Sequence, residues 1–271
     1  MKTIKELEEI AKNIRIGIIE AVYGAKSGHP GGALSIADIL AVLYFNEMNI
    51  NPKEPNSPSR DRLILSKGHG APALYSALAE RGYFPKEDLK TFRKIDSYIQ
   101  GHPDMNKVPG VDMTTGSLGQ GLSLANGMAM SSKMNKDGFK VYCILGDGEL
   151  DEGQVWEAAM TASHYKLDNL CVIVDNNDLQ IDGSVDKVMN PYPIDKKFGS
   201  FGFNVLKVDG HNIEELISAF KEAKKTKGNP TVIIANTIKG KGVSFMENEA
   251  SWHGKAPNAE EYVQAMKELN L

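Results

Sequence analysis

An aspartate between two glycines, Gly146-Asp147-Gly148, directly follows the apolar run Val141–Leu145. Glycines let a backbone approach a ligand closely, and a helix starting after such a turn offers free N–H groups and a positive dipole end to an anion. A carboxylate there repels a phosphate unless a cation lies between the two. Asp147 is therefore a candidate ligand of Mg²⁺ bridging to phosphate, although the tripeptide alone favours a helix N-cap aspartate in a tight turn.

A second pattern strengthens the metal interpretation. The next apolar run, Leu170–Asp175, leads into Asn176-Asn177, about 30 residues after Asp147. In a parallel βαβ unit this spacing brings Asn177 close to Asp147, provided that the two strands are neighbours. An amide oxygen and a nearby backbone carbonyl would add hard oxygen ligands for Mg²⁺. The alternative for this pattern is an Asn-Asn turn in a surface loop.

The histidines are a further group of candidate residues. Five of the six adjoin glycine: His29, His69, His102, His211 and His253. Turns allow a side chain to face a cleft, and histidine titrates near neutral pH, as proton-transfer chemistry requires. Taken singly, a His-Gly pair is more often a surface turn. We interpret His211, which precedes a helix, and His164, inside a helical stretch, as structural.

Elements able to position these residues alternate along the chain. Strand-like apolar runs are expected at residues 62–66, 140–145, 169–175, 204–209 and 231–237, and helices at 4–22, 33–46, 71–81, 120–134, 155–165 and 213–227, with a last helix capped by Asn258. Near-continuously apolar strands separated by helices predict an α/β fold, a parallel sheet with helices on both faces. No linker divides the sequence, so residues 1–271 are interpreted as a single domain. Ligands of such sheets bind at the carboxyl ends of the strands.

Composition excludes several classes of function. The 271 residues carry a net charge of −4, which provides no basic surface for nucleic acid. No apolar run approaches the roughly 20 residues needed to span a bilayer, and the amphipathic N-terminus lacks the apolar centre of a signal peptide. Cys143 and Cys171 lie in strand-like runs and are interpreted as reduced core residues, which is typical of a cytoplasmic protein.

Several blocks together resemble the transketolase family. The spacing from Gly146-Asp147-Gly148 to Asn176-Asn177 resembles the thiamine diphosphate signature of that family. Five further blocks occur in transketolase order, from residue 27 to residue 257: SGHPG at 27, KGHG at 67, GHPD at 101, TTGSLGQG at 114 and WHGKAP at 252. The resemblance covers almost the whole chain and implies the diphosphate-binding (PP-type) domain of the thiamine diphosphate fold.

The resemblance implies a set of cofactor and metal residues. Mg²⁺ would be held by Asp147, the Asn177 side chain and the Leu179 carbonyl. Thiamine diphosphate would be contacted by His69, Gly116, Ser117, Leu118, Gly148, Asn177 and Ile181. Glu152, counted with the cofactor site, and Glu157 resemble acidic residues that the family places at its subunit interface. Solvated charges on the first turns of a helix are the alternative for this pair.

Substrate contacts and a partner are implied in the same way. His29 and His253 would face the reacting carbonyl and hydroxyls, and His102 the first hydroxyl of the ketose donor. The reaction implied is transfer of a two-carbon ketol unit from a ketose phosphate to an aldose phosphate, as in the pentose phosphate pathway. Whole transketolases are more than twice as long and carry a pyrimidine-binding domain with the cofactor-activating glutamate. We therefore expect a separate C-terminal partner subunit, with two copies of each chain.

Two positions depart from the family pattern, and several rival functions stay open. The family often has Pro at Ser117 and Asn at Lys67, where a lysine would add positive charge near a phosphate.

Rivals with the same cofactor are the α-type subunit of a 2-oxo acid dehydrogenase and a deoxyxylulose phosphate synthase fragment. A non-catalytic transketolase-like binding subunit is another. A nicotinamide-binding Rossmann domain is disfavoured because Gly119-Gln-Gly121 does not follow an apolar strand.

Overall fold

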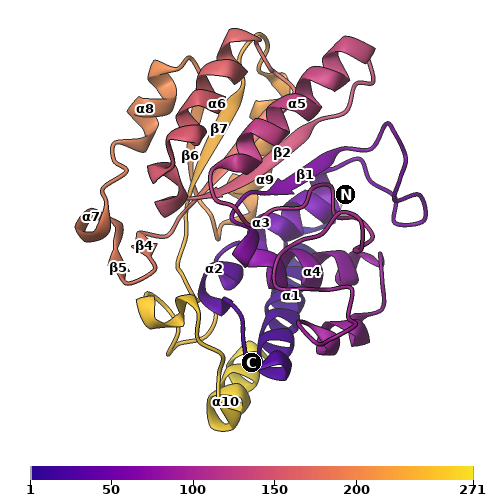
Figure 1. Ribbon diagram of the computed structural model, residues 1–271, viewed down its shortest axis with the longest axis vertical. Coiled ribbons are helices and arrows are strands. Elements are labelled where there is room, and N and C mark those ends of the chain that lie inside the picture. The colour runs from indigo at the N-terminus through magenta and orange to yellow at the C-terminus, as the bar shows by residue number, and fades with distance from the viewer. Residues whose placement is uncertain (1, 271) are drawn as a thin grey trace.

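The computed structural model describes residues 2–270 and is built around a five-stranded parallel sheet (Figure 1). The strand order is β1-β2-β3-β7-β6, and every neighbouring pair runs parallel. The bounds are β1 Arg62–Leu65, β2 Val141–Gly146, β3 Leu170–Asn176, β7 Thr231–Asn236 and β6 Asn204–Asp209. The predicted parallel sheet is confirmed, and each expected strand lies within one residue of its observed bounds.

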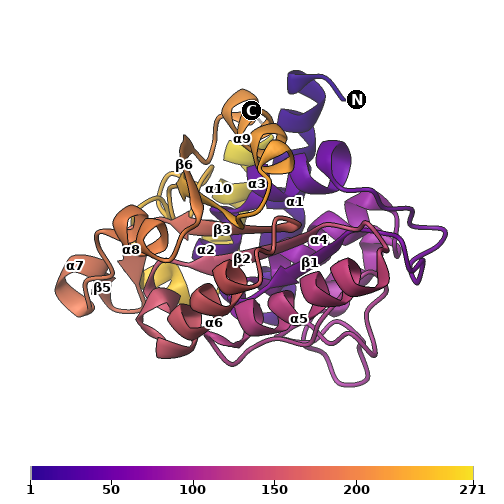
Figure 2. The same cartoon turned by 90° about the horizontal axis from the view of Figure 1, so that it is seen from above.

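Helices cover both faces of this sheet because its central strands are apolar on both sides. Along β3, Cys171 and Ile173 join one core cluster, whereas Val172 and Val174 join the other. Figure 2 shows α5 and α6 on one side of the sheet and α1, α3, α4 and α9 on the other. The long helices are α1 Ile4–Ala25, α4 Ala71–Arg81, α5 Gln120–Asn135, α6 Gly153–His164, α9 Ile213–Lys225 and α10 Ala259–Leu269.

The first and last helices begin where their side chains predict. Thr3 and Glu6 form a reciprocal capping box at α1, and Asn258 and Glu261 form another at α10. The two helices meet through the stacked rings of Tyr23 and Tyr262, whose centroids lie 4.0 Å apart. The first and last helices of the described chain are therefore joined on one side of the sheet.

The expected helix at residues 33–46 is wrong as a single element. It is divided into α2 Pro30–Leu34, α3 Ala37–Val42 and a π-helical turn at Leu43–Glu47. The break falls at Ser35, whose buried hydroxyl contacts the Gly32 carbonyl and the Asp175 carboxylate. A serine that bonds outside the helical ladder competes with helix continuation, and this contact turns α2 toward the ends of the strands.

Several short elements have no expectation in the sequence. They are the 3₁₀ turns η2 Gly68–Gly70, η3 Lys86–Thr91, η4 Gly148–Asp151 and η5 Ala250–His253, the hairpin β4 Leu179–Gln180 with β5 Gly183–Ser184, and the helices α7 Val185–Val188 and α8 Ile194–Ser200. Four of them, η2, η4, β4 and η5, carry candidate site residues. Too few residues form each one for a periodic pattern to reveal it.

The cysteines and the helices agree with the compositional expectations. Cys143 and Cys171 are both buried and free. No helix within residues 2–270 combines the length and apolar character needed to cross a membrane.

Two glycines of α5 provide a matched test of packing. A Cβ at Gly121 would lie 2.5 Å from the Ser66 Cβ and 2.7 Å from its Cα, whereas nothing lies within 4 Å of a Cβ at Gly127. Gly121→Ala should lower the free energy of unfolding by about 1–3 kcal/mol through overpacking. Gly127→Ala should raise it by about 0.5–1 kcal/mol because alanine loses less backbone entropy in a helix. Urea unfolding measures both, and equal effects would contradict the close approach.

Candidate functional site

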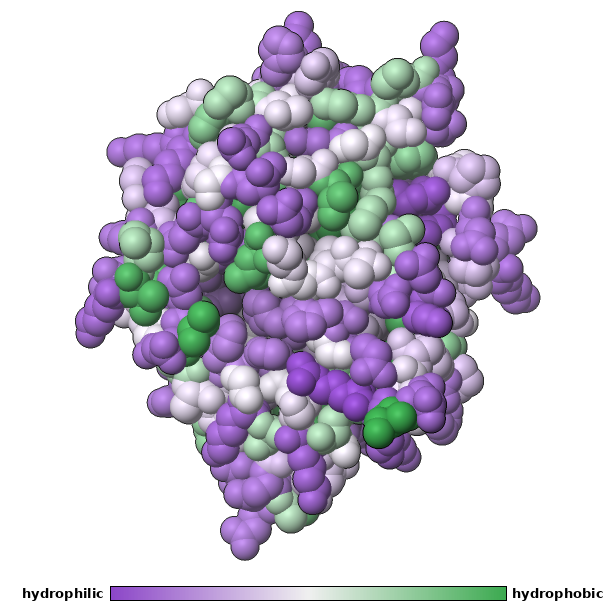
Figure 3. All heavy atoms as spheres, in the orientation of Figure 1, coloured by the Kyte–Doolittle hydropathy of each residue, from purple (hydrophilic) through white to green (hydrophobic). Residues whose placement is uncertain are grey.

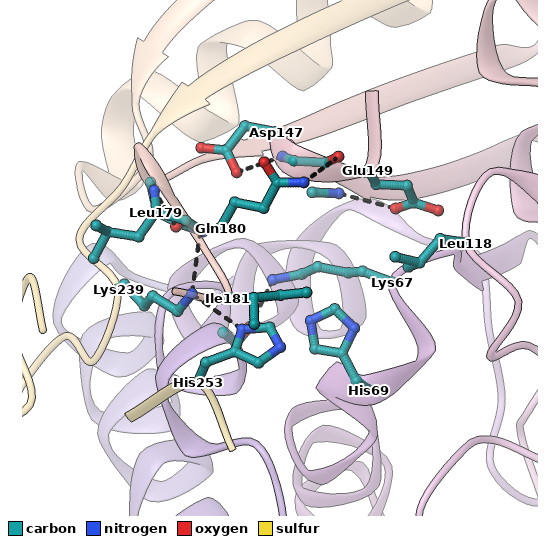
Figure 4. A pocket seen from close by; sticks show the side chains of 14 residues that line it. Lys67, His69, Leu118, Asp147, Glu149, Leu179, Gln180, Ile181, Lys239 and His253 are labelled. Atoms are coloured by element: carbon teal, nitrogen blue, oxygen red, sulfur yellow. Dashed lines mark hydrogen bonds between the residues drawn. The ribbon is translucent and has the colours of Figure 1, made fainter. Parts of the chain in front are cut away.

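One pocket lies at the carboxyl ends of β1, β2, β3 and β7, where ligands of parallel sheets bind. It is lined by Gly32, Lys67, His69, Leu118, Gly146, Asp147, Gly148, Glu149, Asn177, Leu179, Gln180, Ile181, Lys239 and His253. Figure 4 shows Asp147 and Glu149 along one side of the pocket, with His69 and His253 facing them across it. The structure thus brings together most of the residues predicted for cofactor and metal.

Asp147 lies at the end of β2 and is only 2% exposed. Its two carboxylate oxygens accept hydrogen bonds from the backbone N–H groups of Gly148, at 2.8 Å, and Asp178, at 2.6 Å. The second bond joins the loops after β2 and β3, which are neighbouring strands as expected. Burial, followed by the nearby Asp175 carboxylate, raises the pKa of Asp147 to about 7. A bound cation would relieve this unfavourable burial of charge.

Asn177 lies just beyond β3 and is fixed by its neighbours. Its amide nitrogen donates to Asp175 Oδ2 at 2.8 Å, and its amide oxygen accepts from the Leu179 N–H at 3.2 Å. Asp175 is fully buried and also accepts from Lys67 Nζ at 2.6 Å. The Lys67 ammonium counteracts the effect of burial and keeps the pKa of Asp175 below its usual value.

The Leu179 carbonyl faces a positive charge in the pocket. Lys239 Nζ donates to this carbonyl at 3.1 Å and lies 3.2 Å from His253 Nδ1. Burial and the neighbouring Lys67 lower the pKa of Lys239 to about 8.

Gln180 lies next to Gly148, because a Cβ at residue 148 would come within 2.7 Å of the Gln180 side chain. A glycine is therefore required at this point of the pocket wall.

These groups fit a magnesium diphosphate. Asp147 supplies one carboxylate, and Asn177 and Leu179 supply an amide and a carbonyl oxygen, a ligand set that suits Mg²⁺ when phosphate oxygens and waters complete it. Gln180 Oε1 is buried without a hydrogen-bond partner, so the pocket wall has an acceptor oxygen that a bound ligand could satisfy. Within residues 2–270 no three His, Cys, Asp or Glu side chains form a metal-binding group, and a site with a single carboxylate needs none.

Three of the predicted histidines lie together at the pocket, which His69 and His253 line and beside which His29 contacts both rings. His29 is the N-cap residue of α2, while His69 lies in η2 and His253 in η5. Their ring centroids are separated by 5.3 Å (His29–His69), 5.4 Å (His29–His253) and 5.1 Å (His69–His253). His29 Nδ1 is buried and has no partner. A ligand oxygen between these rings would satisfy it.

The surroundings keep these imidazoles neutral. Burial and then Arg93 lower the pKa of His29 to about 4, and burial and then Lys239 lower that of His253 to about 4. The pKa of His69 is also lowered, by burial and then by Lys67. A neutral imidazole both donates and accepts a hydrogen bond. The three rings therefore suit hydroxyl and carbonyl oxygens of a polyol.

His102 lies apart from this group, at an outer depression that also contains Ser27, Arg93 and Gly101. Arg93 Nη1 donates to Ser27 Oγ at 2.9 Å, and its Nε is buried without a partner. A Cβ at Gly101 would meet the guanidinium at 2.9 Å. Burial and then Arg93 lower the pKa of His102. A guanidinium that lines an open depression beside a histidine suits an anionic group.

The loop Gly116–Leu118 joins the pocket only in part. Leu118 lines the pocket, whereas Ser117 is exposed. Gly116 packs on the His102 ring, because a Cβ there would lie 3.2 Å from it. Glu149 fixes this loop: its carboxylate accepts from the N–H groups of Gly119, at 2.9 Å, and Gly146, at 3.0 Å.

Two predicted acidic residues lie outside the pocket. Glu152 and Glu157 are exposed, at the start and in the middle of α6. A Cβ at Gly119 would lie 2.7 Å from the Glu152 Cβ, so Glu152 packs against the turn before α5.

His211, interpreted as structural, is held by two contacts. Its Nδ1 lies 2.7 Å from Asp38 Oδ2, and its Nε2 accepts a hydrogen bond from the Ile238 N–H at 2.8 Å.

Sequence reasoning missed several residues of the site: Gly32, Glu149, Asp175, Gln180, Arg93 and Lys239. Lys239 could have been predicted in the same way as Asp147, because it lies just after the expected strand at residues 231–237. Glu149 adjoins the Gly-Asp-Gly turn, but nothing in its neighbours predicts a buried carboxylate. Arg93 has no local pattern, since only the close approach of Gly101 places it.

Comparison with known proteins relates the chain to one family. Residues 7–270 match the family model described as transketolase, thiamine diphosphate binding domain. The chain is 47% identical over 264 residues to a 6-deoxy-6-sulfo-D-fructose transketolase subunit of Clostridium sp. strain MSTE9, covering 97% of this chain and 96% of the relative. It is 42% identical to an apulose-4-phosphate transketolase subunit of Phocaeicola vulgatus, covering 98% and 95%.

A solved structure gives the same result for the fold. The chain superposes on transketolase from Campylobacter jejuni with a TM-score of 0.92 at 37% identity. All of this chain is covered, but only 43% of the Campylobacter chain. The chain therefore spans less than half the length of that transketolase, whereas it matches the two subunits above over nearly their whole length.

The raised pKa of Asp147 predicts a pH dependence of the metal-free protein. Between an unfolded pKa near 3.8 and a folded pKa of about 7, the folded state binds one more proton. As the pH rises through this window, the Asp147 carboxyl therefore lowers the free energy of unfolding by about 1.4 kcal/mol for each pH unit. Above about pH 7 the free energy of unfolding falls no further on its account. The difference in unfolding free energy between wild type and Asp147→Ala should fall by about 2 kcal/mol from pH 5 to pH 7. Urea unfolding in chelator measures it.

Excess Mg²⁺ and thiamine diphosphate provide the control. Both ligands should remove the decline in wild type by favouring the ionised carboxylate, and should leave Asp147→Ala unaffected. A pH-independent difference in chelator would contradict the assigned burial of charge.

Proposed function

Because this chain belongs to the transketolase family, as its thiamine diphosphate-binding domain, we propose that it is the diphosphate- and Mg²⁺-binding subunit of a two-chain transketolase. The observation that carries the proposal is the meeting of Asp147, Asn177 and the Leu179 carbonyl in one pocket, facing the histidines. A pure binding module has no need of both groups. The reaction is transfer of a two-carbon ketol unit from a ketose to an aldose.

Residues of this chain would hold the cofactor at its charged end. Asp147, Asn177 and the Leu179 carbonyl would bind Mg²⁺, and the Gly148 N–H, His69 and Lys239 would donate to the diphosphate or neutralise it. Gly116, Ser117, Leu118 and Ile181 would border the rings. Bound thiamine diphosphate supplies the carbon nucleophile of the reaction. The protein contributes anchoring, orientation and exclusion of water.

The neutral histidines would act on the substrate oxygens. The rings of His29 and His253 lie edge to face, with centroids 5.4 Å apart. They would donate or accept a proton at the reacting carbonyl and its neighbouring hydroxyl. His102, farther out, would contact the first hydroxyl of the donor. An imidazole with a lowered pKa is in its basic form at neutral pH, so it can accept a proton without first losing one.

The substrate class is a sugar with an anionic end group. The relatives named above act, by name, on a sulfonated ketose and on apulose 4-phosphate. The positive charge of Arg93, which lines the outer depression, would attract a terminal phosphate or sulfonate. Exchange between pentose phosphates, as in the pentose phosphate pathway, belongs to the same class. Two buried, unpaired cysteines are compatible with a reducing cytoplasm.

A partner chain completes the proposed enzyme. It would carry the pyrimidine-binding domain and the cofactor-activating glutamate, in an assembly with two copies of each chain. Figure 3 shows hydrophobic side chains gathered over the region of β5 and α7, beside the pocket. Ile181, Val188 and Met189 are 54%, 45% and 61% exposed there. Such a cluster at the rim of a site is typical of an interaction surface.

Reconstitution tests the proposal. The chain and its C-terminal partner, co-purified from the native host, should transfer a two-carbon unit from xylulose 5-phosphate to ribose 5-phosphate only when both chains, Mg²⁺ and thiamine diphosphate are present. Sulfofructose and apulose 4-phosphate are the further donors to compare. Binding of thiamine diphosphate without activity on any donor would favour a non-catalytic binding subunit.

Removal of a reacting histidine should slow the assembled enzyme. His29→Ala and His253→Ala are each expected to lower kcat by about 10²–10⁴-fold, the usual contribution of a positioned acid or base. His164→Ala, an exposed residue of α6, serves as the control and should leave kcat essentially unchanged. Unchanged turnover in either pocket variant would remove that histidine from the catalytic set.

Arg93 should discriminate between charged and uncharged donors. Arg93→Leu is expected to raise KM for xylulose 5-phosphate roughly 10- to 100-fold, as loss of a charged hydrogen bond predicts, while leaving KM for the uncharged ketose erythrulose within about threefold. Lys94→Ala, an exposed neighbour, is the matched control. Equal losses on both donors would show that Arg93 supports the fold of the depression instead.

A further inference from the structure

We propose that Asp175 is the positioning residue of the magnesium site: it does not bind the ion but fixes the Asn177 side chain with its oxygen directed to the metal. This inference rests on the proposed function, since it concerns how this chain would hold Mg²⁺. Asp175 is the last but one residue of β3, and no part of it is exposed.

The Asp175 carboxylate accepts hydrogen bonds from four side-chain donors. Oδ2 accepts from Lys67 Nζ at 2.6 Å, Ser35 Oγ at 2.7 Å and Asn177 Nδ2 at 2.8 Å, and Oδ1 accepts from Thr237 Oγ1. A carboxylate oxygen has about two lone-pair sites, so Oδ2 is saturated and one site on Oδ1 remains. The Lys67 ammonium also neutralises the charge that would otherwise attract the ion. Asp147, which accepts only two backbone bonds, keeps free capacity.

The bond from Asn177 decides which way its amide faces. An amide has one donor end and one acceptor end, and Asp175 accepts only from the nitrogen. The oxygen is consequently turned away from Asp175 and accepts from the Leu179 N–H, and Asn177 is one of the residues that line the pocket. The reverse orientation would place two oxygens in contact and present NH₂ to a cation. Hydrogen-bond partners that orient a metal ligand in this way typically change metal affinity by about 10–100-fold.

The same carboxylate joins four segments that carry site residues. Ser35 follows α2, which begins after His29, and Lys67 lies two residues before His69. Asn177 precedes the Leu179 carbonyl, and Thr237 lies two residues before Lys239. Loss of the Asp175 charge should therefore have its main effect on the metal ligands, through Asn177. A smaller effect is expected on the relative positions of the four segments.

The test compares Asp175→Asn with the double variant Asp175→Asn/Asn177→Asp, called the swap, in the full chain assembled with its partner subunit. Asp175→Asn removes the charge and should lower the affinity for Mn²⁺, used as a spectroscopic substitute for Mg²⁺, by about 10- to 100-fold in the presence of thiamine diphosphate. The swap restores a donor–acceptor pair with its direction reversed. Because the carboxylate that it introduces at residue 177 directs an oxygen to the ion, the swap should regain roughly tenfold or more of the loss. Electron paramagnetic resonance measures free Mn²⁺ without any assay of activity.

Asp112→Asn is the matched control, because Asp112 is a buried carboxylate paired with Arg60 in another part of the chain. It should lower the melting temperature without changing Mn²⁺ affinity. Wild type that fails to bind Mn²⁺ and thiamine diphosphate would contradict the proposed function. Wild type that binds, together with a folded Asp175→Asn that binds within about threefold of it, would overturn the positioning role alone.

The swap keeps the test decisive if Asp175→Asn does not fold. A folded swap that binds Mn²⁺ within about tenfold of wild type supports the role of Asp175 in orienting residue 177. A folded swap that is weaker than wild type by more than about tenfold overturns it, because an oxygen at residue 177 would then be insufficient without the original carboxylate.

Discussion

The Asp175 carboxylate, buried at the end of a central strand and bound by an ammonium, two hydroxyls and an amide, is the interaction on which the site depends. Burying a charge is costly unless it is paired and fully hydrogen-bonded. Here every donor comes from a segment that follows a strand or a helix of the pocket. The requirement to satisfy one carboxylate therefore sets the relative positions of those segments.

A second buried carboxylate has the opposite role. Asp147 lies nearby with only two backbone donors and a pKa raised to about 7, so it stands to gain from a cation. Glu149, the third, joins the Gly146 and Gly119 turns through its backbone bonds. Three acidic residues thus lie at the ends of neighbouring strands. The one with the fewest hydrogen-bond donors, Asp147, is the proposed metal ligand, and the other two hold segments of the pocket together.

The positive groups of the pocket complete this division. Lys67 is committed to Asp175 and the Gly32 carbonyl, whereas Lys239 contacts the Leu179 carbonyl and His253. Their charges, with burial, keep the histidines neutral. A site proposed to receive a diphosphate and a polyol therefore holds its two lysines beside neutral imidazoles.

The sequence by itself determined the parallel sheet, the strand bounds and the Asp147–Asn177 pair, because these follow from local apolar runs and from the rule that strand ends meet at one edge. It also indicated His29, His69 and His253 through their glycine neighbours. Only the tertiary structure decided that Asp175 contacts the Asn177 amide, that α2 breaks at Ser35 and that Arg93 lies beside His102. Each depends on contacts between side chains that no local pattern specifies, such as Ser35 with Asp175, because a donor supplied by another segment leaves no periodic signal in the sequence.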